Sequence, residues 1–109
     1  MQYEIFGKVI KGDQYGRKIG FPTVNLETQA KELPPAGVYA GEVFLDNVVY
    51  RAGIAIDSNN KIDAHLIGYH GDAYGKEVKL TLNKFLREYK NFNTEEELIN
   101  QIKKDINLC

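Results

Sequence analysis

Hydrophobic and polar residues alternate along most of this 109-residue chain with the period of two that is typical of β-strands. The alternating runs are rich in β-branched and aromatic residues, and they predict strands at Tyr3 to Ile10, Gly37 to Leu45, Val48 to Ile56, Lys61 to Ile67 and Glu77 to Leu82. Asp46-Asn47 reads as a tight hairpin turn and residues 57–60 as another turn, because Asp and Asn tolerate positive φ. Successive short antiparallel strands predict a barrel or a sandwich.

Residues 12–35 form a long polar stretch that is interrupted by Gly and Pro and shows no helical pattern. A loop of this length in a small domain is usually functional or contains a short strand of its own. Thr23 to Leu26 is the candidate strand.

The C-terminal residues carry the one strong helical signal. Thr94-Glu-Glu-Glu97 has the form of a capping box, and apolar residues then recur at helical spacing at Leu98, Ile99, Ile102 and Ile106. We expect a helix over about 94–107 that covers an open face or end of a barrel formed by about 1–92. The chain then forms a single domain over residues 1–109.

Composition and charge restrict the partners. The chain has 14 Lys plus Arg against 15 Asp plus Glu, so no bulk positive field would hold nucleic acid or an anionic membrane. No apolar run is long enough to span a bilayer or to act as a signal peptide. The single cysteine, Cys109, excludes an internal disulfide and fits a reducing compartment. We expect a cytoplasmic monomer that acts on small molecules, without nucleic-acid or membrane partners.

The segment from Gly16 to Asn25 combines glycines, cations, a proline, a hydroxyl and an amide. Glycines allow backbone N–H groups to approach a phosphate, and Arg17 and Lys18 supply positive charge. Thr23 and Asn25 offer neutral oxygens of the kind that Mg²⁺ accepts beside an anion. The segment therefore predicts a loop that binds phosphate and a metal.

Several short motifs occur in one order along the chain: Val9-Ile-Lys-Gly12, Gly16-Arg17, Gly20-Phe-Pro-Thr-Val-Asn25, Leu33-Pro34, Gly37-Val-Tyr-Ala40, Asp63-Ala-His65, Asp72-Ala-Tyr-Gly75 and Phe85-Leu-Arg-Glu-Tyr-Lys-Asn-Phe92. With these motifs the chain resembles the riboflavin kinase (flavokinase) family over nearly its whole length. The likeness is to the single-domain form, similar to the C-terminal domain of bifunctional bacterial riboflavin kinase/FAD synthetases. It implies an all-β fold, a six-stranded antiparallel Greek-key barrel with a C-terminal helix. The implied activity is ATP- and Mg²⁺-dependent phosphorylation of the riboflavin 5′-hydroxyl to give FMN.

The resemblance also implies roles for individual residues. It places Mg²⁺ on Thr23 and Asn25, and the nucleotide on Gly12, Arg17, Gly20, Phe21, Pro22 and Thr23. Phosphoryl transfer needs mainly positioning and the spreading of negative charge, which cations, backbone amides and a metal provide.

The family's catalytic glutamate falls on Asp63, which would accept the proton of the hydroxyl. Aspartate keeps the charge but is one methylene shorter, and a general base must come within about 2.6–3.2 Å of its donor or act through a water. Asp63 could also be an exposed strand residue with no catalytic role. His65 would share its face of the strand.

The resemblance places the flavin against His65, Tyr74, Arg87, Lys90 and Phe92. An aromatic ring can wall an isoalloxazine pocket, and a guanidinium can bind the polar edge of the flavin ring or the product phosphate. For Phe85 and Leu86 we expect core packing.

Two departures from the family leave an alternative open. Aspartate stands at position 63, and the loop at 57–60 is shorter than the glycine- and proline-containing loop common in relatives. The alternative is a flavin- or nucleotide-binding pseudoenzyme, with a regulatory role and weak or no turnover. A small barrel that binds an oligonucleotide is a third reading, which the neutral charge disfavours.

Overall fold

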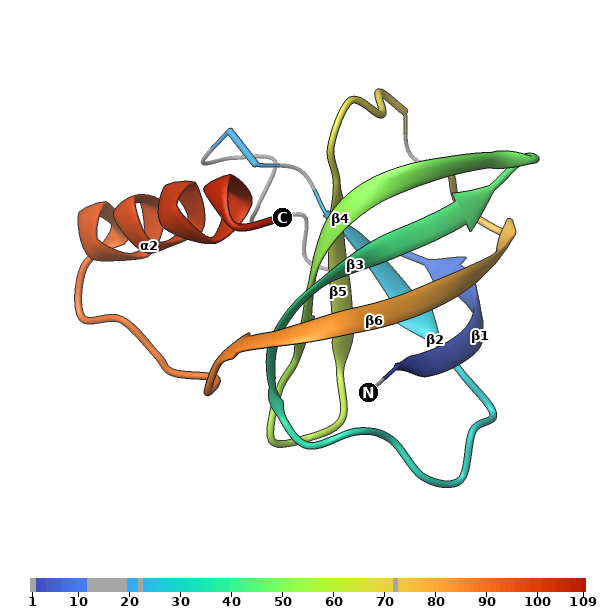
Figure 1. Ribbon diagram of the computed structural model, residues 1–109, viewed down its shortest axis with the longest axis horizontal. Coiled ribbons are helices and arrows are strands. Elements are labelled where there is room, and N and C mark those ends of the chain that lie inside the picture. Colours follow the sequence, from blue (N-terminus) through green and yellow to red (C-terminus); the bar gives the residue numbers. More distant parts are fainter. Residues whose placement is uncertain (1, 12–19, 22, 72) are drawn as a thin grey trace.

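The computed structural model describes residues 2–11, 20, 21, 23–71 and 73–109. In the part of the chain that the structure describes, six antiparallel strands close into a barrel in the order β1-β2-β5-β4-β3-β6, and a C-terminal helix stands beside it (Figure 1). The strands are β1 (Tyr3–Ile10), β2 (Val24–Glu27), β3 (Gly37–Leu45), β4 (Val48–Ile56), β5 (Ile62–Leu66) and β6 (Glu77–Arg87). The predicted fold class is confirmed.

The barrel is filled by the apolar residues of the alternating pattern. Every second residue is buried along β2, β5, the second half of β4 and the first half of β6, whereas the first five residues of β3 are all buried. The largest fully buried side chains are Val9, Val43, Leu45, Ile54, Ile56, Ile62, Leu80 and Leu82. Burial of one such side chain contributes about 1.5–3 kcal/mol. The other residues of each strand face outward, so any site on the strands lies on the outer surface of the barrel wall.

The turns between the strands follow the sequence prediction. Asp46 and Asn47 join β3 to β4 with φ values of 52° and 64°, both in the left-handed region, as a type I′ hairpin requires. Between β4 and β5 the side chain of Asp57 accepts hydrogen bonds from the backbone N–H groups of Asn59 at 2.8 Å and Lys61 at 2.9 Å. Residues 57–60 therefore form a well-defined turn.

Strand β6 is longer than the sequence pattern predicted, because it continues past Leu82 to Arg87. It pairs with both β1 and β3, and its register with β3 shifts twice, between Val38 and Tyr39 and between Ala40 and Gly41. These irregularities break the alternation of the last residues. Phe85, which we expected in the core, is 45% exposed, and its ring lies 5.2 Å from that of Tyr39.

Helix α2 (Glu95–Asn107) begins as predicted. The Thr94 hydroxyl caps it by accepting a hydrogen bond from the Glu97 N–H at 3.1 Å. In Figure 1 its C-terminal end is the end nearer the barrel. The buried residue of the helix is a carboxylate, Asp105, whereas its apolar residues are only half-buried. Among the described residues, no helix has the length and apolar character needed to cross a bilayer.

Candidate functional site

The predicted metal ligand Asn25 and the predicted base Asp63 are direct neighbours. Asn25 lies on β2 and Asp63 on β5, and the register of the two antiparallel strands places them opposite each other. Directly opposed residues point to the same face, with their Cβ atoms about 4.5–5.5 Å apart. Both side chains are half-buried on the outer face of the barrel. An amide oxygen suited to a cation thus stands beside a carboxylate.

The residues before β2 join this pair. The ring of Phe21 meets that of His65 edge to face, with 6.0 Å between the ring centroids, which ties the segment before β2 to β5. Gly20 has a φ of +92°, a value that favours glycine, and Thr23 is exposed directly before β2. Three predicted nucleotide residues, Gly12, Arg17 and Pro22, lie outside the described residues.

Strand β4 presents two small residues beside Asp63 and His65. Ala55 lies opposite Asp63, and Gly53 lies opposite His65. Cys109 covers Gly53, since a Cβ atom added to this glycine would stand 3.5 Å from the Cys109 Sγ. The wall next to Asp63 therefore has little side-chain bulk. The sequence alone did not identify Gly53 or Ala55 as site residues.

The register connects Asp63 to the predicted flavin residue Arg87. Asp63 on β5 pairs with Ala55 on β4, Ala55 pairs with Val38 on β3, and Val38 pairs with Arg87 on β6. Neighbouring strands lie about 4.8 Å apart, so three steps cover about 14 Å. An elongated ligand that lies over Ala55 could meet the carboxylate at one end and the guanidinium at the other.

Arg87 is held by helix α2. Its Nε lies 3.1 and 3.3 Å from the two carboxylate oxygens of Asp105, and its Nη2 lies 2.9 Å from Oδ2. Arg87 Nη1 donates to the carbonyl oxygen of Glu88 at 3.1 Å. Two cations lie close to the Phe92 ring, whose centroid is 5.7 Å from Arg87 Cζ and 5.1 Å from Lys90 Nζ. Three predicted flavin residues are therefore brought together.

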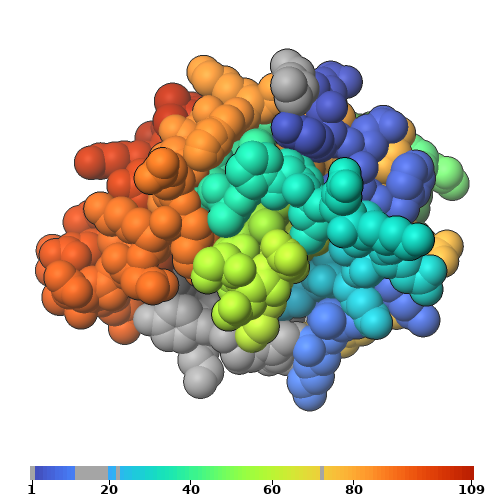
Figure 2. Space-filling view, turned by 90° about the horizontal axis from the view of Figure 1, so that it is seen from below, coloured from blue at the N-terminus to red at the C-terminus, as the bar shows by residue number. Residues whose placement is uncertain are grey.

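A pocket of about 500 Å³ borders this cluster. Its lining comes from the turn after β4 and from the segment after β6: Ala36, Asp57, Ser58, Asn59, Glu88, Tyr89, Lys90 and Asn91. Figure 2 shows this turn in yellow-green between the orange segment after β6 and the teal segment before β3. The turn at residues 57–60 thus borders the Arg87 end of the site.

Tyr74 lies apart from the other predicted flavin residues. Its turn is bonded to the end of β1, because Gly75 N–H donates to the Val9 carbonyl at 2.9 Å and Val9 N–H donates to the Lys76 carbonyl at 2.9 Å. Arg87 lies at the other end of β6, whose 11 residues extend about 3.3 Å each. The arrangement does not support one flavin site that includes both residues, and Tyr74 is on the side of the predicted nucleotide.

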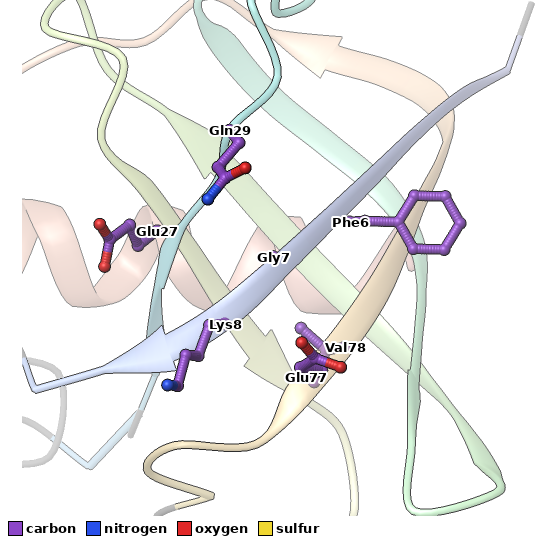
Figure 3. A pocket seen from close by; sticks show the side chains of 7 residues that line it. All are labelled: Phe6, Gly7, Lys8, Glu27, Gln29, Glu77 and Val78. Carbon is purple, nitrogen blue, oxygen red and sulfur yellow. The ribbon is translucent and has the colours of Figure 1, made fainter.

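A second pocket, of about 590 Å³, is lined by none of the predicted site residues. It lies around β1 and is lined by Phe6, Gly7, Lys8, Glu27, Gln29, Glu77 and Val78. Figure 3 shows the Lys8 side chain between the side chains of Glu27 and Glu77, its cross-strand partners. Mixed charges of this kind give no anion site.

The last residue of the chain belongs to the helix end beside the site. The Cys109 thiol donates to the Asp105 carbonyl oxygen at 3.2 Å. Burial raises the pKa of this thiol, the negative charge of Asp105 raises it further, and Arg51 opposes the rise. The thiol therefore stays protonated at neutral pH and serves as a packing group.

Known proteins match the chain in sequence. The family model described as flavokinase, riboflavin kinase, matches residues 1–109. The bifunctional riboflavin kinase/FMN adenylyltransferase of Escherichia coli strain K12 is 33% identical over 112 residues, which cover 94% of this chain and 36% of that protein. The RNA-binding riboflavin kinase RibR of Bacillus subtilis strain 168 is 35% identical over 94% of this chain and 47% of its own length.

A solved structure shares the fold. The riboflavin kinase from Trypanosoma brucei superimposes with a TM-score of 0.77 at 20% identity, over 98% of this chain and 74% of that one. The chain spans about a third of the length of the bifunctional E. coli relative. The match over the whole sequence, together with the barrel and its C-terminal helix, shows that the chain belongs to the riboflavin kinase family.

Proposed function

We propose that this chain phosphorylates the 5′-hydroxyl of riboflavin with ATP and Mg²⁺ to give FMN. The register pair of Asn25 and Asp63 is the observation that carries the proposal. It puts a neutral oxygen ligand for a phosphate-bound cation next to a carboxylate that can accept a hydroxyl proton. Phosphoryl transfer uses a cation that neutralises the phosphates and a base within reach of the attacking hydroxyl.

The residues before and on β2 suit the nucleotide half of the site. Thr23 and Asn25 supply a hydroxyl and an amide oxygen, hard neutral donors that fit Mg²⁺ when phosphate oxygens complete its shell. Bound there, Mg²⁺ would neutralise negative charge on the phosphates. Gly20, with its positive φ, can direct backbone N–H groups toward the nucleotide. We propose that Gly12, Arg17, Phe21 and Pro22 also bind the nucleotide, and that Tyr74 lies on the nucleotide side.

Asp63 is the proposed base. As the riboflavin oxygen forms its bond to the γ-phosphorus of ATP, the bond from that phosphorus to the bridging oxygen breaks and ADP leaves. The hydroxyl proton passes to the Asp63 carboxylate. Because the opposite residue, Ala55, is small, the hydroxyl can approach the carboxylate closely enough to offset the shorter aspartate side chain.

The flavin would lie across β4 from Asp63 toward Arg87. The ribityl chain passes over Ala55, His65 borders it from β5, and the polar edge of the flavin ring meets Arg87. Phe92 and Lys90 support that end, because the Phe92 ring contacts both cations. The order of these groups matches a substrate with a reactive hydroxyl at one end and a polar ring at the other.

Incubation with riboflavin, ATP and Mg²⁺, followed by chromatography of the flavins, tests the activity directly. We expect FMN to form. Asp63→Asn should lower kcat by roughly 10²–10⁴-fold, the range for loss of a general base, while riboflavin binding persists. Asp46→Asn is the matched control, since Asp46 lies in the exposed turn between β3 and β4.

Three outcomes would contradict the proposal or its base. Quenching of riboflavin fluorescence without FMN under any nucleotide or metal would indicate a flavin-binding protein without turnover. Unchanged kcat in Asp63→Asn would remove Asp63 from catalysis. Strongly salt-dependent binding to single-stranded RNA, without flavin binding, would favour an oligonucleotide-binding barrel.

A further inference from the structure

The most buried residue of helix α2 is Asp105, a carboxylate, and not one of the helix's large apolar residues. The side chain of Asp105 is 10% exposed and that of its partner Arg87 is 22% exposed. Gln101 Nε2 donates to Asp105 Oδ1 at 3.0 Å, so the carboxylate is fixed from its own helix as well. Replacing such an ion pair by apolar residues is often neutral or stabilising, so anchoring the helix does not by itself require the pair.

The geometry of the pair leaves part of the guanidinium available. Arginine has five N–H groups. The Nε–H and one Nη2–H face Asp105, and one Nη1–H faces the Glu88 carbonyl. One N–H group on each terminal nitrogen remains, and we call these two donors the outer fork. They lie in the same plane, and paired donors of this kind suit a bidentate acceptor.

We propose that Asp105 is a positioning residue, which holds the plane of the Arg87 guanidinium so that its outer fork faces the flavin. The inference rests on the proposed function, because Arg87 is taken to bind the flavin there. Asp105 does not touch the substrate. It fixes a long side chain that would otherwise lose rotational freedom on binding, and such ordering lowers affinity.

The first test compares two Asp→Asn substitutions that each break an ion pair. Asp105→Asn keeps the shape but removes the charge that holds Arg87, and Asp46→Asn breaks the exposed pair with Lys76. We expect Asp105→Asn to raise both the riboflavin Kd, measured by fluorescence quenching, and the KM about tenfold or more. The KM for ATP should stay unchanged, and Asp46→Asn should match the wild type. Asp105→Glu, which keeps the charge, should recover part of the loss.

A charge swap separates positioning from anchoring. The double variant Arg87→Asp with Asp105→Arg keeps an ion pair between β6 and α2 but moves the guanidinium to the helix. We expect its melting temperature to lie closer to the wild type than that of Asp105→Asn, while riboflavin affinity stays reduced at least tenfold. If Asp105→Asn does not fold, Asp105→Glu, which keeps Arg87 and its ion pair but displaces the carboxylate by one methylene, gives the comparison.

The outcomes distinguish the inference from the function on which it rests. Wild-type riboflavin affinity in folded Asp105→Asn or in the swap would overturn the inference and leave the kinase proposal intact. Wild-type protein that binds riboflavin but makes no FMN would overturn the kinase proposal, and the Kd series would still support or overturn the role of Asp105. Wild-type protein that binds no riboflavin would overturn both.

Discussion

Tyr39 shows how one buried polar group is accommodated next to the proposed site. Its side chain is 4% exposed, and its hydroxyl donates to the Pro35 carbonyl oxygen at 2.6 Å. Burial raises the pKa of the phenol above its ordinary value of 10.0, and Tyr3 adds a smaller effect in the same direction. The folded protein therefore favours the neutral phenol more than the unfolded chain does.

This difference in pKa predicts a loss of stability in alkali. Below pH 10 the phenol is neutral in both states; as the pH rises from there, the unfolded chain loses the proton first, so the free energy of unfolding falls. In Tyr39→Phe we expect about 1 kcal/mol less stability at pH 7, from the lost hydrogen bond, and a shallower decline above pH 10. Urea denaturation from pH 7 to 11 measures both. Tyr89→Phe, which removes the hydroxyl of a 41% exposed residue, is the matched control.

At the residue scale, the sequence predicted which residues belong to the candidate site better than it predicted which of them contact each other. Asn25 and Asp63 were each proposed from motifs, but their contact depends on the register of β2 with β5, which no local pattern specifies. The pair of Arg87 with Asp105 joins residues 18 positions apart through a helix orientation that the sequence does not contain. Phe85 was misjudged because an aromatic residue near a strand end can pack on the outer surface as well as in the core.

Among the elements, β3 is the most constrained by close approach to its neighbour. A Cβ atom on Gly41 would collide with the backbone carbonyl oxygen of Thr81 on β6, next to the register shift at Ala40/Gly41. By contrast, a Cβ atom on Gly53 of β4 would make ordinary contact with Cys109 Sγ at 3.5 Å.

Substitution by alanine should therefore affect the free energy of unfolding differently at these two glycines. Gly41→Ala should lower the free energy of unfolding by about 1–3 kcal/mol or more, as overpacking against backbone does. Gly53→Ala should change it by less than about 0.5 kcal/mol, the usual range for substitutions without such a clash. Chemical denaturation followed by circular dichroism compares them. Equal stability of the two variants would mean that β3 and β6 can separate at Gly41 without cost.

The strand boundaries were predictable where alternation was regular. β1, β3 and β4 have the predicted limits, and the cap at Thr94 was visible as a capping box. β2 and β5 differ from their predicted limits by one residue at each end. β6 was cut short in the prediction, because a strand that passes a bulge loses its period of two.

For the whole molecule, the proposed path of the flavin crosses β4 at Ala55. Ala55→Leu would place a branched side chain on this path and should raise the KM for riboflavin about tenfold, equivalent to about 1.4 kcal/mol, without changing the KM for ATP. Steady-state kinetics with each substrate varied measures this. Val49→Leu, at an exposed position near the other end of β4, is the matched control. Equal effects of the two variants would place the flavin elsewhere.

At this scale the fold followed from the sequence, but the arrangement of the site did not. Tyr74 and Arg87 both carry motif signals, yet β6 separates them by its whole length, because one precedes the strand and the other ends it. A sequence motif does not show at which end of the barrel its residues lie. The strand pairing of the closed sheet shows which motifs lie at the same end.

The pairing of β1 with β6 has a consequence for how the protein is made. Tyr3 lies opposite Leu82, so the barrel closes between two strands that are far apart in the sequence. Contacts of such high sequence separation slow folding, and a chain emerging from the ribosome at about 5–20 residues per second cannot form them early. The first strand must wait for β6 to emerge, and during that interval its apolar residues are exposed to chaperones and to neighbouring chains.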